Sequence, residues 1–137
     1  MRTLYVTDLD GTLLNTKDRI NPESLRIVNG LIDRGLLFTY ATARSLESAR
    51  VVTEGLTLNM PVIVYNGAFL MDPGTGEILS SLFFTKEEAE SVRCSLEAAQ
   101  ISPLVYSFRQ DRERVSWNTA RENEGMKRYL SKRQGDR

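Results

Sequence analysis

The stretch Leu4–Asn15, LYVTDLDGTLLN, is the most informative segment of this chain. Residues 3–7 form an apolar run that predicts a buried β-strand, and the strand leads directly into Asp8 and Asp10. Gly11 follows, where a tight turn is expected. Two carboxylates at a strand end have two explanations, because they either cap a turn or carry out chemistry.

The composition of the 137 residues excludes several classes of function. Lysine plus arginine and aspartate plus glutamate both number 18, so there is no net positive charge to attract nucleic acid or an anionic membrane. No run approaches the ~20 apolar residues of a membrane span. The single cysteine, Cys94, cannot form an internal disulfide, so a cytoplasmic location is expected. Because histidine is absent, acid–base chemistry would depend on carboxylates, lysine or tyrosine.

The first half of the chain alternates predicted strands with predicted helices. Apolar runs at residues 36–41 and 61–65 predict two further strands. Asn21 is the expected N-cap of one intervening helix, and Ser45 is the expected N-cap of the other. Strands that are apolar along their whole length and separated by helices indicate an α/β fold, with a Rossmann-like parallel sheet covered on both faces.

The pattern changes in the second half. Residues 68–81 predict a hairpin around a Pro-Gly-Thr-Gly turn, and residues 85–88, TKEE, form a capping box. The elements predicted beyond this point are a helix to about residue 100, strands at 104–108 and 114–117, and a last helix at about 120–131. We therefore predict an α/β unit over residues 1–80 and an α+β unit over residues 81–137.

Polar residues follow each of the three predicted strands of the first unit. In doubly wound sheets, ligands bind at the carboxyl ends of the strands, so these residues are expected to meet. Thr42 and Arg44 follow the second strand and offer a hydroxyl group and a cation to a phosphate. Asn66 and Gly67 follow the third strand, where they predict a hairpin turn, with a secondary role for Asn66 in lining the pocket.

The carboxylates of Asp8 and Asp10 are the candidate catalytic groups. Two neighbouring negative charges favour a shared divalent cation, and Mg²⁺ prefers oxygen ligands. Their roles can also separate, with one carboxylate as nucleophile and the other as general acid and base. Gly11 would let the turn expose backbone N–H groups to a phosphate.

The segments DLDGTLLN and ATARS resemble the first two motifs of the haloacid dehalogenase superfamily, specifically its Cof-type phosphatases with a large inserted cap of the C2 type. The segment VIVYNGAFLMDPGTGEIL resembles the passage from the core into the cap. The resemblance implies that residues 1–80 are the N-terminal part of the core and that residues 81–137 are part of the cap. It also implies a phosphoric monoester hydrolase that acts on small phosphorylated metabolites such as sugar phosphates.

The resemblance further assigns roles to individual residues. Asp8 would attack phosphorus and form an aspartyl-phosphate, and Asp10 would protonate the leaving group and later activate water. The Asp8 side chain and the Asp10 backbone carbonyl would hold Mg²⁺, and Thr42 would bind the transferring phosphoryl group.

The sequence departs from the family pattern in two respects. Ala43 occupies the place of a glycine, which is tolerable if its φ is negative. The family's phosphate-binding lysine and its second acidic metal motif follow the cap and have no counterpart here. Gly135-Asp136 matches that motif in letters only, and we reject it as a metal site.

We therefore expect a chain truncated before the later motifs. The alternative is a non-catalytic fragment that self-associates, or binds a partner, through an open sheet edge beside the first strand.

Overall fold

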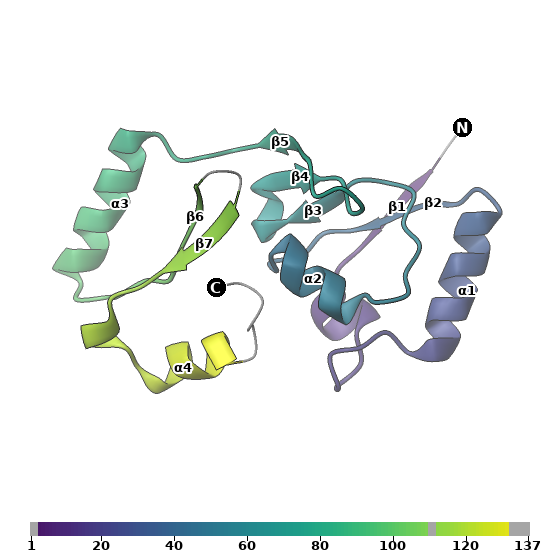
Figure 1. Ribbon diagram of the computed structural model, residues 1–137, viewed down its shortest axis with the longest axis horizontal. Coiled ribbons are helices and arrows are strands. Elements are labelled where there is room, and N and C mark those ends of the chain that lie inside the picture. Colours follow the sequence, from purple (N-terminus) through teal and green to yellow (C-terminus); the bar gives the residue numbers. More distant parts are fainter. Residues whose placement is uncertain (1–2, 110–111, 132–137) are drawn as a thin grey trace. The chain divides into compact units, whose positions relative to one another are not determined.

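The computed structural model describes residues 3–109 and 112–131, and the chain divides into two compact units, Met1–Leu82 and Phe83–Arg137 (Figure 1). Gly135 and Asp136 lie outside the described residues. No helix in the described ranges is long and apolar enough to cross a membrane.

The first unit is an α/β structure whose strands occupy the predicted places. Its strands are β1 (Leu4–Thr7), β2 (Leu37–Tyr40), β3 (Val62–Val64), β4 (Phe69–Met71) and β5 (Ile78–Ser81). β1 and β2 pair in parallel, and an isolated parallel bridge between Ala41 and Ile63 links β2 to β3. The sheet then continues as the antiparallel order β3-β4-β5, so residues 68–81 form the predicted hairpin.

Both helices of the first unit begin at the predicted caps. They are α1 (Pro22–Asp33) and α2 (Leu46–Val52). The Asn21 side chain accepts a hydrogen bond from the Glu23 N–H at 2.9 Å, and the Ser45 side chain accepts one from the Ser48 N–H at 3.1 Å. Each cap satisfies a donor that the first turn of a helix leaves without a partner, so the cap sets where the helix begins.

The first strand is much less buried than the sequence predicts. Leu4, Tyr5 and Val6 are 45%, 53% and 49% exposed, whereas Tyr40 at the end of β2 is 1% exposed. Within the described residues β1 pairs only with β2, and side chains of consecutive strand residues point to opposite faces. Both faces of β1 are therefore accessible. The prediction of burial on both faces is wrong for this strand, while the open edge is present.

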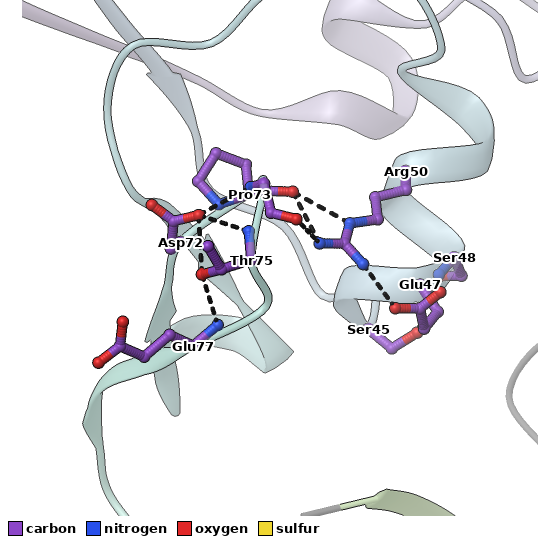
Figure 2. Close-up of polar contacts among 9 residues, drawn as sticks. Ser45, Glu47, Ser48, Arg50, Asp72, Pro73, Thr75 and Glu77 are labelled. Atoms are coloured by element: carbon purple, nitrogen blue, oxygen red, sulfur yellow. Dashed lines mark hydrogen bonds and ion pairs between the residues drawn. The ribbon is translucent and has the colours of Figure 1, made fainter.

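Arg50 connects α2 to the turn between β4 and β5 (Figure 2). Its Nε and Nη2 donate to the Pro73 carbonyl at 3.1 and 2.8 Å, and Nη2 also donates to the Gly74 carbonyl at 3.0 Å. Nη1 pairs with Glu47 at 2.9 Å. Most of the guanidinium donors therefore hold the hairpin turn against the helix.

The same turn makes the stability of the first unit sensitive to acid. Asp72 Oδ1 accepts from the N–H groups of Gly74 and Thr75, at 2.9 and 2.7 Å, and from the Thr75 hydroxyl at 3.1 Å. These bonds, with those from Thr75 contributing most, lower the pKa of Asp72 below its usual value. Because the folded pKa is depressed, the stabilisation is present above the unfolded pKa of about 3.9 and is lost as pH falls through the folded value.

We expect Asp72→Asn to reduce the loss of melting temperature that the wild type shows on acidification between about pH 5 and pH 2. Circular dichroism melts across this range measure the effect. Asp33→Asn removes another exposed carboxylate and serves as the matched control. If the melting temperatures of the wild type and Asp72→Asn fell equally as the pH was lowered, the prediction would be contradicted.

The described residues of the second unit form two α-helices and one hairpin. Its elements are α3 (Lys86–Ala98), β6 (Val105–Arg109), β7 (Arg112–Ser116) and α4 (Glu124–Ser131). The predicted capping box opens α3, since the Thr85 N–H donates to Glu88 at 2.8 Å and the Glu88 N–H donates to the Thr85 hydroxyl at 3.2 Å. β6 and β7 pair antiparallel, as the two strand-like segments predict. The Tyr106 and Tyr129 hydroxyls lie 2.9 Å apart and link β6 to α4.

The last helix is shorter than the sequence predicts. A separate 3₁₀ turn occupies Thr119–Arg121, and Glu122 has an extended ψ of 130°. The Asn123 side chain then accepts from the Met126 N–H at 2.9 Å. This side-chain cap starts α4 at Glu124 and corrects the predicted start near residue 120.

Candidate functional site

The turn after β1 carries the two candidate catalytic carboxylates. Asp8 has an extended backbone, with φ −81° and ψ 162°, and its side chain makes no hydrogen bond that would cap the turn. Gly11 has a φ of +78°, a conformation that favours glycine. The Leu14 N–H donates to the Leu9 carbonyl at 2.9 Å and closes the turn. The turn is therefore stabilised by backbone geometry, and the Asp8 carboxylate does not take part in capping it.

Leu9 anchors this turn, a role that the sequence interpretation missed. It is fully buried, at 0% exposure, while Asp8 and Asp10 on either side of it are exposed. An apolar residue between two carboxylates was the available signal, because such a residue has reason to point into the core while its neighbours face solvent. Burial of Leu9 therefore presents both carboxylates at the surface.

The loop after β2 is joined to the turn after β3 by backbone hydrogen bonds. The Asn66 N–H donates to the Thr42 carbonyl and the Tyr65 N–H to the Arg44 carbonyl, each at 3.0 Å. The turn contains three successive residues with positive φ, namely Tyr65 (+52°), Asn66 (+55°) and Gly67 (+93°). The Asn-Gly pair therefore makes the predicted hairpin between β3 and β4, and this hairpin also supports the Thr42 loop.

Thr42 lies at the centre of the second loop and is buried, at 4% exposure. Its hydroxyl oxygen accepts a hydrogen bond from the Arg44 N–H at 3.2 Å, which leaves the hydroxyl proton available for donation. Ala43 is not among the residues with positive φ, so the condition for an alanine in place of the family's glycine is met. Phosphate binding by Thr42 stays a prediction, as does pocket lining by Asn66.

Arg44 binds the carboxylate of Asp10 through two hydrogen bonds. Arg44 Nε lies 2.9 Å from Asp10 Oδ2, and Nη2 lies 2.5 Å from Oδ1, a bidentate arrangement between residues 34 positions apart. The Arg44 side chain is 12% exposed and that of Asp10 is 50% exposed. The sequence proposed Arg44 as a cation for phosphate, whereas in the structure its guanidinium orients the second carboxylate. The pair joins the turn after β1 to the loop after β2.

We expect a double-mutant cycle with Arg44→Met and Asp10→Asn to give a coupling energy of about 0.5–1 kcal/mol, because a pair that is partly exposed is screened by solvent. Urea unfolding of the wild type, both single variants and the double variant measures this energy. The partly exposed pair of Arg50 and Glu47 provides a comparison cycle on the neighbouring helix. Strictly additive effects of Arg44→Met and Asp10→Asn would show that the pair contributes no coupling.

The donor set at this turn suits a hard divalent cation only in part. The Asp8 carboxylate and the Asp10 backbone carbonyl are the candidate oxygen ligands, since both carboxylate oxygens of Asp10 accept hydrogen bonds from Arg44. Mg²⁺ in proteins often keeps several waters beside one or two carboxylates. Within residues 3–109 and 112–131, no group of three or more aspartate, glutamate, cysteine or histidine side chains is placed to hold a metal ion. The two aspartates are therefore compatible with Mg²⁺ as partial ligands.

Comparison with curated proteins identifies phosphatases as relatives. The chain is 33% identical over 92 residues to the HMP-PP phosphatase of Serratia proteamaculans, covering 67% of this chain and 33% of that protein. It is 29% identical over 100 residues to the 5-amino-6-(5-phospho-D-ribitylamino)uracil phosphatase YwtE of Bacillus subtilis, covering 73% of this chain and 34% of the relative. The chain thus spans about a third of the length of these relatives.

Solved structures give the same fold. The phosphatase BT1666 of the haloalkanoate superfamily, from Bacteroides thetaiotaomicron, matches with a TM-score of 0.71 at 17% identity, over 96% of this chain and 46% of that chain. The protein TM0651 from Thermotoga maritima matches with a TM-score of 0.68 at 25% identity, over 99% of this chain and 48% of that chain. These matches confirm the predicted α/β fold.

A family model described as haloacid dehalogenase-like hydrolase matches residues 5–135, almost the whole chain. The matched range includes the carboxylate turn after β1, the Thr42 loop after β2 and the hairpin after β3. The chain belongs to the family of haloacid dehalogenase-like hydrolases, as its first two motifs predict.

Proposed function

We propose that this chain carries the nucleophile half of a Mg²⁺-dependent phosphatase that acts through an aspartyl-phosphate. The observation that carries the proposal is the turn after β1, where the Asp8 carboxylate makes no capping bond and the Asp10 carboxylate is oriented by Arg44. Carboxylates that merely ended a strand would be expected to cap the turn. The geometry favours chemistry at Asp8.

The two aspartates have complementary roles in this proposal. An Asp8 oxygen forms a bond to phosphorus while the bond from phosphorus to the ester oxygen breaks, and Asp10 gives its proton to that leaving oxygen. In the second step Asp10 takes a proton from water, the water oxygen attacks phosphorus, and the bond to Asp8 breaks. The bidentate pair with Arg44 stabilises the ionised Asp10 carboxylate, the form that takes the proton from water, so Arg44 acts as a positioning residue for the second step. Donation in the first step requires a protonated Asp10 that is released from this pair.

Further residues would bind the phosphoryl group and the metal. The Asp8 side chain and the Asp10 backbone carbonyl would hold Mg²⁺, which supplies charge neutralisation for phosphoryl transfer. The Thr42 hydroxyl and the N–H groups of the turn at Gly11 would donate to phosphoryl oxygens, with Asn66 lining the pocket. The boundary between the two units, after Leu82, supports assigning residues 1–80 to the core and residues 81–137 to part of a cap.

The proposed substrates are small phosphorylated metabolites, such as sugar phosphates. The names of the two relatives specify different small phosphorylated compounds, which supports this class of substrate and leaves the individual compound open. The formal net charge of zero is consistent with a small-molecule substrate in place of a nucleic acid or a membrane. The single cysteine supports a cytoplasmic location.

The test is phosphate release from an aryl phosphate with Mg²⁺, combined with acid trapping of phosphorylated protein and peptide mass spectrometry. We expect the trapped phosphoryl group on the peptide that contains Asp8. We also expect phosphate release to be slow, since only two carboxylates are available at this turn. Labelling elsewhere, or release that does not depend on Asp8, would contradict the proposal.

A second candidate function is a non-catalytic fragment that associates with another chain. The exposure of Leu4, Tyr5 and Val6 along an open sheet edge favours this function. Absence of both phosphate release and trapped phosphoprotein, in a chain that is folded by circular dichroism, would leave it as the supported alternative.

A further inference from the structure

Tyr65 has a backbone conformation that an aromatic residue rarely adopts. Its φ is +52°, in the left-handed region, where a bulky side chain is strained. The other described non-glycine residues with positive φ are Asp18, Asn66 and Gln100. Aspartate and asparagine tolerate this region, and Gln100 follows the cap of α3, where a left-handed residue commonly ends a helix. Neither explanation applies to Tyr65.

Reversal of the chain between β3 and β4 does not require a left-handed Tyr65. A two-residue hairpin turn needs positive φ at its two central residues, and Asn66 (+55°) and Gly67 (+93°) supply them. The positive φ of Tyr65 is therefore additional to what the turn needs. Strained backbone of this kind persists only where its surroundings impose it, and it concentrates at functional sites.

Two neighbouring N–H groups show what the conformation achieves. The Tyr65 N–H donates to the Arg44 carbonyl, and the Asn66 N–H donates to the Thr42 carbonyl, each at 3.0 Å. In an extended strand, consecutive N–H groups point to opposite edges, so they do not reach the same neighbouring segment. A left-handed residue between the two peptides turns the second N–H to the same side as the first. One turn thereby holds both ends of the segment 42–44.

The ring of Tyr65 helps to keep the strained conformation. It packs edge-on against Phe69, with ring centroids 5.2 Å apart and an interplanar angle of 64°. Phe69 is 7% exposed and belongs to the core. The Ala68 N–H also donates to the Tyr65 carbonyl at 3.1 Å. The ring and the peptides on both sides of Tyr65 are therefore held in place.

The segment that Tyr65 holds carries the partner of the second carboxylate. The Arg44 side chain is 12% exposed and makes the bidentate pair with Asp10, whose side chain is 50% exposed. Holding a long arginine side chain in one geometry costs conformational entropy. Because the Arg44 backbone is already fixed, only its side chain remains to be ordered. The position of the guanidinium therefore depends on the turn at Tyr65.

We propose that Tyr65 is a positioning residue, whose left-handed backbone holds the segment 42–44 and, through Arg44, the ionised Asp10 that takes a proton from water. The dependence of the ion pair on residue 65 does not require catalysis. The effect on the second chemical step rests on the proposed phosphatase function, so the two effects are measured separately.

Nuclear magnetic resonance of the arginine Nε–H groups tests the dependence of the ion pair on residue 65. An Nε–H in a charge-assisted bond to a carboxylate is held strongly and exchanges slowly with water. The Arg44 signal is identified as the one that Arg44→Met removes. We expect this signal in the wild type, in Tyr65→Asn and in Tyr65→Gly, because asparagine and glycine accept positive φ without the support of the ring. It should weaken in Tyr65→Ala and be lost in Tyr65→Val, whose branched side chain disfavours this backbone most.

All four variants lack the ring, so they compare backbone preference alone. The Nε–H of Arg50, which donates to the Pro73 carbonyl at 3.1 Å, is the internal control and should persist in every folded variant. If Tyr65→Val does not fold, the comparison of Tyr65→Asn with Tyr65→Ala decides the question. Equal Arg44 signals in these two variants, or loss of the Arg44 signal in Tyr65→Asn while that of Arg50 persists, would overturn the proposal.

The lifetime of the trapped phosphoprotein tests the effect on the second step. We expect this lifetime to be up to about 30-fold longer in Tyr65→Val than in Tyr65→Asn, because the penalty for left-handed backbone limits the change in population to this factor. Equal lifetimes in these two folded variants would overturn the catalytic effect of Tyr65. A wild type that forms no phosphoprotein would instead contradict the phosphatase function, and the Arg44 signals would still decide whether Tyr65 positions the pair.

Discussion

Replacing Asp8 with asparagine is expected to lower Mg²⁺-dependent phosphate release from an aryl phosphate on the order of a hundredfold or more, and to abolish trapped phosphoprotein. An amide oxygen is a poor nucleophile towards phosphorus and carries no charge with which to bind the metal. The substitution is nearly isosteric, and the Asp8 side chain makes no capping hydrogen bond, so the fold should be preserved. Long incubations and single-turnover conditions are appropriate because we expect the wild-type rate itself to be low.

Asp10→Asn is the informative companion to Asp8→Asn. An aryl oxygen leaves without much help from an acid, so phosphorylation of Asp8 should continue while hydrolysis of the phosphoprotein slows, because the general base is absent. Trapped phosphoprotein should therefore accumulate in Asp10→Asn and be absent in Asp8→Asn. Equal behaviour of the two variants would contradict the separate roles that we assign to the aspartates.

Replacing Leu9 with alanine is expected to lower the free energy of unfolding of the first unit by about 2–5 kcal/mol, the range for deletion of a fully buried leucine side chain. Leu9 is 0% exposed and lies between the two candidate catalytic carboxylates. The substitution leaves a cavity under the turn and removes the contacts that hold Asp8 and Asp10 at the surface. Since a domain is stable by only about 5–15 kcal/mol, this loss is a large fraction of the total.

Urea unfolding followed by far-ultraviolet circular dichroism measures the effect of Leu9→Ala. Fluorescence alone is unsuitable, because Trp117, the only tryptophan, belongs to the second unit. Leu79→Ala makes the same chemical change at a position that is 47% exposed, and it should alter stability by less than about 0.5 kcal/mol. Equal effects of the two substitutions would show that Leu9 does not anchor the turn.

Local sequence signals predicted the elements well where side chains act on their own backbone. Asn21, Ser45 and the Thr85–Glu88 capping box begin helices as predicted, because each cap bonds to N–H groups two or three residues away. The same mechanism explains the error in the last helix. The cap at Asn123 overrides the apparent helical pattern from residue 120, and the sequence interpretation did not give it enough weight.

The structure brings the predicted candidate residues to neighbouring strand ends, whereas the contacts between their side chains were not predicted. The aspartates, Thr42 and Asn66 all follow strands, and the strand ends are joined by backbone hydrogen bonds, such as that from the Ala41 N–H to the Thr7 carbonyl at 2.8 Å. The bidentate pair of Arg44 with Asp10 was not predicted, because sequence spacing carries no information on where a long side chain points. This pair changes the proposed role of Arg44 from binding phosphate to positioning Asp10.

The sequence by itself determined the family, the α/β order of the first unit and the two carboxylates that end β1, because these depend on short motifs and on apolar periodicity. Only the tertiary structure decided that Leu9 is the buried anchor, that Arg44 orients Asp10 and that β1 is exposed on both faces. The physical reason is that burial and ion pairing depend on which segments meet in space. An apolar strand has the same sequence pattern whether its neighbours cover it or leave it open.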